Sequence, residues 1–70
     1  MRIRYDPDAD ALYLRLSEEA VNESDEVAPG VIVDYSSGGV PVGLEILDAS
    51  KRFGGGLFRV EVELAPARSG

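Results

Sequence analysis

Val31 to Leu47 reads V-I-V-D-Y-S-S-G-G-V-P-V-G-L-E-I-L and decides the fold, because it holds two apolar runs joined by Ser36-Ser37-Gly38-Gly39. A cluster of turn residues between β-branched runs is typical of a β-hairpin. Setting Tyr35 opposite Val40 gathers the apolar side chains on one face of this hairpin. The residues predicted for that face are Val31, Val33, Tyr35, Val40, Val42, Leu44 and Ile46.

A second hairpin is predicted upstream, where Arg2–Tyr5 and Tyr13–Leu16 alternate polar and apolar residues around the turn-rich run D-P-D-A-D-A. Setting Tyr5 opposite Leu12 keeps the apolar residues of both strands on one face. The further pairs predicted by this register are Ile3 with Leu14, Arg4 with Tyr13, and Arg2 with Arg15. Since opposed arginines repel each other, we expect Asp34 and Glu45 to complete a small charge ladder on the second face.

Three further segments complete the prediction. The acidic run Ser17–Gly30 is either a bare connection or contains a weak edge strand over Val21–Val27. Asp48 to Phe53 suits one helical turn capped by Asp48, and Phe58 to Leu64 alternates cleanly as a strand. We therefore predict a mainly β fold: an antiparallel sheet of two β-hairpins plus a C-terminal strand, with at most one short helical turn near 48–53. Residues 1–64 form one small domain, and 65–70 form a flexible tail.

The composition argues against an enzyme. The chain has 70 residues and neither histidine nor cysteine, so its serines have no imidazole to activate them. Thirteen acids against seven bases give a net charge of −6, which repels nucleic-acid phosphates and anionic lipid and favours a basic protein partner. Solubility alone is the alternative explanation of this charge. The missing thiols and the lack of a long apolar run fit a cytoplasmic protein.

Asp6, Asp8 and Asp10 have the spacing that opens an EF-hand calcium loop, but that loop also needs a glycine and a glutamate where this chain has Ala11 and Ser17. Turn and capping roles explain the three aspartates more simply. We therefore predict no catalytic, cofactor-binding or metal-binding residue. A small-ligand or divalent-metal site on this loop, or on the Asp34 and Glu45 face, is the alternative.

Self-association is predicted because the sheet has an apolar face and no helix long enough to cover it. A second copy would cover that face in a homodimer or a higher even oligomer, whereas a sheet curled into a small barrel would cover it within one chain. The residues predicted for the interface are Leu12, Leu14, Leu16, Val33, Tyr35, Val42, Leu44, Phe58, Val60 and Val62. Those predicted to bind a basic partner are Glu18, Glu19, Glu23, Asp25 and Glu26.

Three blocks, Tyr5–Tyr13, Pro29–Tyr35 and Val42–Arg52, resemble the small bacterial family called domain of unknown function 2283. The resemblance covers nearly all of residues 1–52 and implies a compact, β-rich protein with no assigned activity. Some members of the family look like antitoxin partners of small basic toxins. This chain departs from the usual D-G turn by having Gly38-Gly39, and it carries the additional strand-like segment 57–64.

Overall fold

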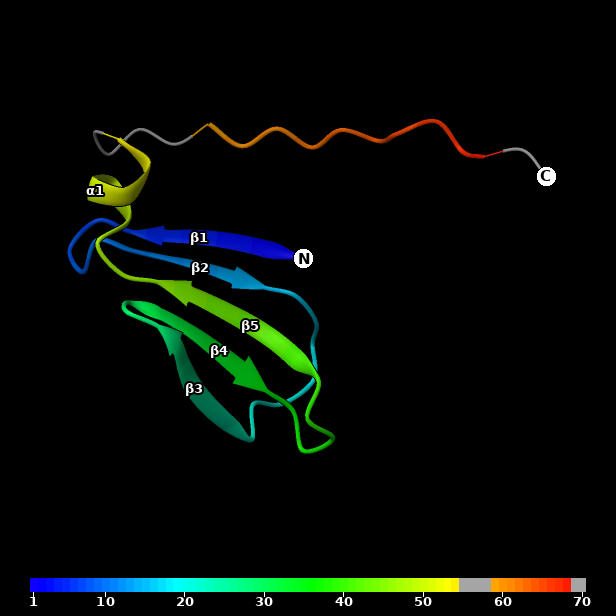
Figure 1. Ribbon diagram of the computed structural model, residues 1–70, viewed down its shortest axis with the longest axis horizontal. Coiled ribbons are helices and arrows are strands. Elements are labelled where there is room, and N and C mark those ends of the chain that lie inside the picture. Colours follow the sequence, from blue (N-terminus) through cyan, green and yellow to red (C-terminus); the bar gives the residue numbers. More distant parts are fainter. Residues whose placement is uncertain (55–58, 69–70) are drawn as a thin grey trace.

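A computed structural model of the chain describes residues 1–54 and 59–68 and shows one open antiparallel sheet with a single short helix (Figure 1). The strand order is β1-β2-β5-β4-β3, so β1 and β3 are its edges. The elements are β1 (Arg2–Asp6), β2 (Ala11–Arg15), β3 (Glu23–Ala28), β4 (Val31–Tyr35), β5 (Pro41–Ile46) and α1 (Ala49–Phe53). The predicted mainly β class and the single helical turn are confirmed, while the closed barrel is wrong because both edges remain open.

The first hairpin has the predicted register throughout. Tyr5 pairs with Leu12, and Arg2 lies directly opposite Arg15. The strict alternation of both strands excludes a slip of one residue, which would turn every apolar side chain to the other face, and the length of the turn selects this register over a slip of two.

The register predicted for the central hairpin is wrong. Val33 pairs with Leu44 rather than with Val42, and the ladder is irregular between Asp34 and Tyr35. The Ser36 amide donates to the Val40 carbonyl at 2.9 Å, so the tight turn lies between these two residues and Gly39 adopts a positive φ of 77°. Val40 therefore belongs to the turn and is exposed, and the irregularity shifts all pairs beyond it.

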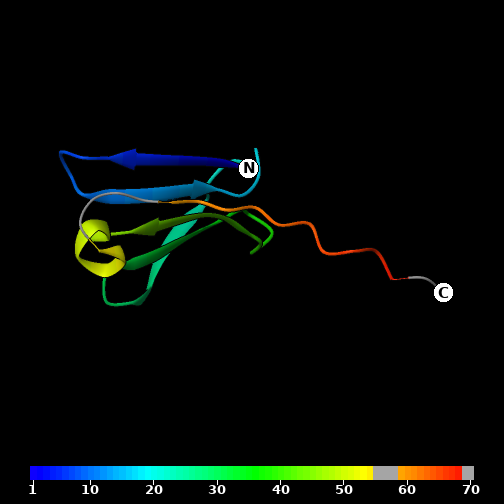
Figure 2. The same cartoon turned by 90° about the horizontal axis from the view of Figure 1, so that it is seen from above.

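The fifth strand of the sheet is β3 and not the predicted C-terminal strand. β3 forms an edge over Glu23–Ala28, close to the Val21–Val27 alternative, and all its residues are exposed. Residues 59–68 pair with no strand and extend away from the sheet (Figures 1 and 2). The predicted strand is thus absent from 59–64, and its first residue, Phe58, lies outside the described residues. Alternation indicates a chain suited to one face of a sheet, but a strand also needs an edge to pair with.

The sheet has little core of its own. Among the described residues, Val42 and Ala49 are the buried apolar ones, and both have no exposed surface. Seen from above, α1 lies at one end of the twisted sheet and does not form a second layer over it (Figure 2). No helix within residues 1–54 and 59–68 has the length and apolar character needed to cross a membrane.

Candidate functional site

One face of the sheet carries two apolar rows that run across the strands. The first row is Tyr5, Leu12, Ile46 and Val31, and the second is Ile3, Leu14, Leu44 and Val33. These side chains are half-buried apart from Ile3, which is 45% exposed. Adjacent side chains on the same face account for this partial burial, since no second layer of the described residues packs on the two rows. The result is a continuous apolar surface across the strands β1, β2, β5 and β4.

Carboxylates border this apolar face at the β3 edge. Asp25 pairs with Val33 and Glu23 pairs with Tyr35, so both acids point to the same side as the apolar rows. Glu26 pairs with Ile32 and points to the opposite side. Inward-pointing charges on an edge strand oppose further strand pairing. The apolar surface therefore ends in negative charge at β3, whereas at β1 it ends in Ile3 and Tyr5.

Only some of the residues predicted for an interface lie together on the apolar face. Leu12, Leu14, Val33 and Leu44 lie in the apolar rows, Tyr35 ends β4, and Leu16 directly follows β2. Val42 has no exposed surface, so it stabilises the single chain and cannot touch a partner. Val60 and Val62 lie in the unpaired segment 59–68, away from the sheet, and Phe58 is outside the described residues.

The residues predicted to bind a basic partner fall into two groups. Glu23, Asp25 and Glu26 lie on β3, while Glu18 and Glu19 lie in the connection between β2 and β3. Glu18 approaches Arg2 at 3.7 Å, and the Glu19 carbonyl accepts a hydrogen bond from Arg15 at 2.5 Å. This connection therefore contacts both opposed arginines, Arg2 through an exposed ion pair and Arg15 through a backbone carbonyl, and the β3 acids lie at the other end of the sheet.

The second face is polar and is organised by Tyr13. Its hydroxyl donates to Asp34 Oδ2 at 2.8 Å, and Ser24 donates to Asp34 Oδ1 at 2.5 Å. The bond to Asp34, together with partial burial, raises the pKa of Tyr13, because ionising the phenol would place two negative charges side by side. Gly43 lies beneath this bond, and a β-carbon there would collide with the Tyr13 hydroxyl.

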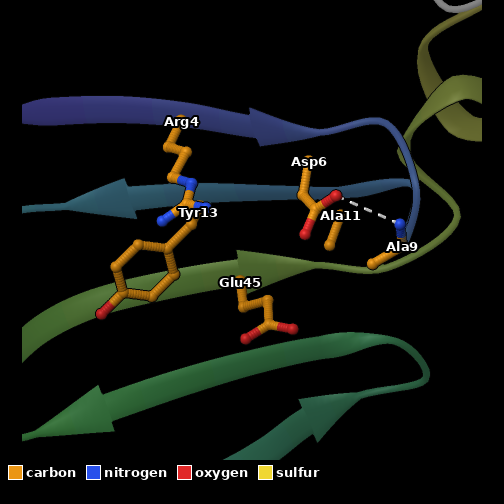
Figure 3. Close-up of a pocket in the computed structure, with 6 residues that line it drawn as sticks. All are labelled: Arg4, Asp6, Ala9, Ala11, Tyr13 and Glu45. Atoms are coloured by element: carbon orange, nitrogen blue, oxygen red, sulfur yellow. Dashed lines mark hydrogen bonds between the residues drawn. The ribbon is translucent and has the colours of Figure 1, made fainter.

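A shallow hollow of about 270 Å³ lies beside Tyr13 on the same face (Figure 3). Its lining residues are Arg4, Asp6, Ala9, Ala11, Tyr13 and Glu45. Asp34 and Glu45 do point to this face as predicted, but among the ion pairs of residues 1–54 and 59–68 none joins either acid to an arginine. The predicted charge ladder is therefore wrong. Tyr13 and Ser24 occupy the carboxylate of Asp34, and the arginines turn to Glu18 and Glu19 instead.

The aspartates of the first turn have separate structural roles. Asp6 Oδ1 accepts the backbone amides of Asp8 and Ala9 at 3.0 and 3.3 Å, which is an Asx turn (Figure 3). Asp10, at a positive φ of 51°, faces α1 instead. Within residues 1–54 and 59–68, no group of three acidic side chains is arranged to hold a metal ion.

Asp10 caps the helix from a distance of forty positions in the chain. Its carbonyl accepts the amide of Ala49 at 3.0 Å, and its carboxylate accepts the amide and the hydroxyl of Ser50 at 2.9 and 2.7 Å. Asp48, predicted as the cap, makes no capping bond with its side chain. The bonds from Ser50, followed by the one from Tyr5, lower the pKa of Asp10, and the pKa of Tyr5 is raised in turn.

Sequence reasoning missed the Tyr13–Asp34 bond and the remote cap at Asp10. The Tyr13–Asp34 bond is indicated in the sequence by Gly43, because a glycine in the middle of a strand is typical of a close approach by a neighbouring group. In the observed register Arg15, Gly43 and Asp34 lie in one row across the strands. No sequence pattern indicates the cap at Asp10, because the position of α1 over the first turn depends on the path of the chain after β5.

Comparison with curated proteins and with solved structures gave no significant match. A family model described as protein of unknown function (DUF2283) matches residues 2–50, which hold all five strands and the start of α1. Since this match covers well over half of the chain, the protein belongs to the DUF2283 family.

Proposed function

We propose that this protein is a non-catalytic interaction module that assembles with a second copy through the apolar face of its sheet. The observation that carries the proposal is the pair of apolar rows, over which residues 1–54 and 59–68 form no second layer. Stable domains bury such a face between two layers, and α1 has only five residues at one end of the sheet. A second sheet in a two-fold dimer would supply the missing layer.

The lack of histidine and cysteine in the chain supports a non-catalytic role. The two most organised polar clusters also have structural explanations. Asp34 is engaged by Tyr13 and Ser24, and Asp10 is engaged by Tyr5 and Ser50. The bonds from Ser50, followed by the one from Tyr5, lower the pKa of Asp10, which makes this carboxylate a poor proton carrier near neutral pH. In the reducing cytoplasm, which a cysteine-free chain fits, the module would act through its surfaces.

Sedimentation of the full chain at micromolar concentration tests the proposed assembly. We expect a dimer or a higher even oligomer, and we expect Leu14→Asp to weaken it, because Leu14 lies in the middle of the second apolar row. Val40→Asp is the matched control, since Val40 lies in the exposed turn and is 52% exposed. A folded, thermally stable monomer of the wild-type chain at this concentration would overturn the proposal.

The β3 edge supports a second function, an antitoxin-like capture of a small basic protein. Glu23, Asp25 and Glu26 lie on an exposed edge strand, and a positively charged extended segment can add to such an edge through its backbone. A lysine-rich peptide is a suitable probe in calorimetry. We expect binding that weakens as salt rises and that Glu23→Lys/Asp25→Lys abolishes. Binding that persists in this variant, or no binding at low salt, would contradict the role.

A further inference from the structure

The segment 59–68 leaves apolar side chains in water. Val62 is 93% exposed and Leu64 is 94% exposed, although they alternate with Arg59, Glu61 and Glu63 as in a strand with one buried face. The segment takes no place in the sheet of its own chain. Its direction is opposite to that of β1 (Figure 1). The segment therefore has the residue pattern of an edge strand, but it pairs with no strand of the sheet.

The outer edge of β1 is the edge whose side chains fit this segment. β1 has β2 on one side only, and Ile3 is 45% exposed. The other open edge, β3, carries Glu23, Asp25 and Glu26, which would repel Glu61 and Glu63. The basic side chains Arg2 and Arg4 make β1 complementary to the same two glutamates.

One antiparallel register matches every position of β1. With Arg4 opposite Glu61, Arg2 meets Glu63 and Asp6 meets Arg59. In the same register Ile3 meets Val62 and Tyr5 meets Val60, which lengthens both apolar rows by one residue. A slip of two residues in one direction opposes Arg4 to Arg59, and in the other direction it opposes Asp6 to Glu61. Opposed like charges destabilise a strand pair, so the matched register is selected over both slips.

We propose that residues 59–64 of one copy add as an antiparallel strand to the outer edge of β1 in a second copy, with Arg4 opposite Glu61. In each copy β1 is the terminal strand of the sheet and residues 59–64 belong to none of its strands, so a reciprocal exchange extends both sheets in a closed two-fold dimer. The inference shares with the proposed function the identity of the partner, a second copy. It concerns a different surface, and either one can hold without the other.

Two charge variants test the exchange. Glu61→Lys/Glu63→Lys makes the segment and β1 both basic, whereas Arg2→Glu/Arg4→Glu makes them both acidic. Each variant alone is expected to self-associate about tenfold more weakly, because two cross-strand pairs change from attraction to repulsion. Mixing the two variants restores association, since each segment then meets a β1 of opposite charge on the other chain. Pairing within one chain would give no recovery on mixing, and that result would overturn the exchange.

Cross-linking gives the register independently, because the chain has no cysteine of its own. A mixture of Ile3→Cys and Val62→Cys chains is expected to form the mixed disulfide under mild oxidation, and a mixture of Val40→Cys and Val62→Cys is the matched control. Equal cross-linking in both mixtures would overturn the register. Assembly through the apolar face alone would leave the oligomer unchanged in Glu61→Lys/Glu63→Lys, which would reject the exchange and leave the proposed function standing. The same conclusion would follow if Leu14→Asp weakened association while both charge variants associated as strongly as the wild type. That result would reject the strand exchange and leave the proposed function standing.

Discussion

Tyr13 hydrogen-bonds to Asp34 across the width of β5, and Gly43 is the residue over which this bond passes. The hydroxyl of Tyr13 lies 2.8 Å from Asp34 Oδ2. A β-carbon on Gly43 would come within 2.9 Å of the same carboxylate oxygen and still closer to the phenol. The bond therefore joins β2 to β4 only because the strand between them has no side chain at this point.

Gly43→Ala is expected to destabilise the protein by about 1–3 kcal/mol, as overpacking a tight site does. Urea denaturation followed by circular dichroism measures this loss. Gly38→Ala is the matched control, because the nearest atom to a β-carbon at Gly38 is Ser36 Oγ at 3.9 Å, and its effect should stay within about 0.5 kcal/mol.

A double variant identifies the cause. Adding Tyr13→Phe to Gly43→Ala removes the phenol oxygen that the new methyl group meets, so part of the lost stability should return. Purely additive losses would contradict this explanation of the glycine.

The phenol of Tyr13 should ionise late in an alkaline titration. Its pKa is raised mainly by the bond to Asp34, so this contribution to stability is fully present below about pH 10 and is lost as the pH rises through the raised value. Absorbance of tyrosinate follows the titration. The pKa of Tyr5 is also raised, so we expect the late component to shrink in Tyr13→Phe without vanishing, and an unchanged late component in that variant would contradict the assignment.

Acid should release the cap on α1. The pKa of Asp10 is lowered by its bonds to Ser50, so its contribution to stability is fully present above about pH 4 and is lost as the pH falls through the lowered value. Asp10→Asn should therefore be less stable at neutral pH and less sensitive to acid. Asp8→Asn is the control, since the side chain of Asp8 is exposed and holds no part of the helix. Parallel acid curves for Asp10→Asn and the wild type would contradict this role.

The parts of the fold that the sequence predicts well are those that local pattern determines. The register of β1 and β2 follows from strict alternation together with the length of the turn, and Asp6 is the turn residue expected from its chemistry. The register of β4 and β5 was not predictable in the same way, because a single irregularity between Asp34 and Tyr35 shifts every pair beyond it. Turn residues mark where a hairpin bends, but they do not determine which residue the ladder skips.

The C-terminal segment shows the other limit of the pattern. Its alternation is as regular as that of β1, yet residues 59–64 pair with nothing in the sheet of this chain, whereas the acidic β3, which has little alternation, does pair. Pairing depends on which edge the chain reaches, and the short β3–β4 connection brings β3 beside β4 directly. Of the candidate sites, the apolar face was predictable from periodicity, and the Tyr13–Asp34 bond depended on the true register.

Arg52 should stabilise the end of the sheet by joining three segments. Its Nε donates to the Leu47 carbonyl at 2.9 Å and its guanidinium also donates to the Pro29 carbonyl, passing over Gly30, whose φ is positive at 72°. Arg52→Ala removes both bonds and should cost about 1–2 kcal/mol in the free energy of unfolding.

Lys51→Ala is the neighbouring control, because Lys51 is exposed and its ammonium group lies 4.0 Å from Asp48, a distance at which a surface pair contributes little. Gly30→Ala should destabilise the same junction, since alanine is strained at a positive φ and its methyl group would displace the guanidinium of Arg52. Both single variants disturb the same contact of Arg52. The double variant Gly30→Ala/Arg52→Ala should therefore lose less stability than the sum of the two single losses. Equal stability of Arg52→Ala and Lys51→Ala would contradict the stabilising role of Arg52.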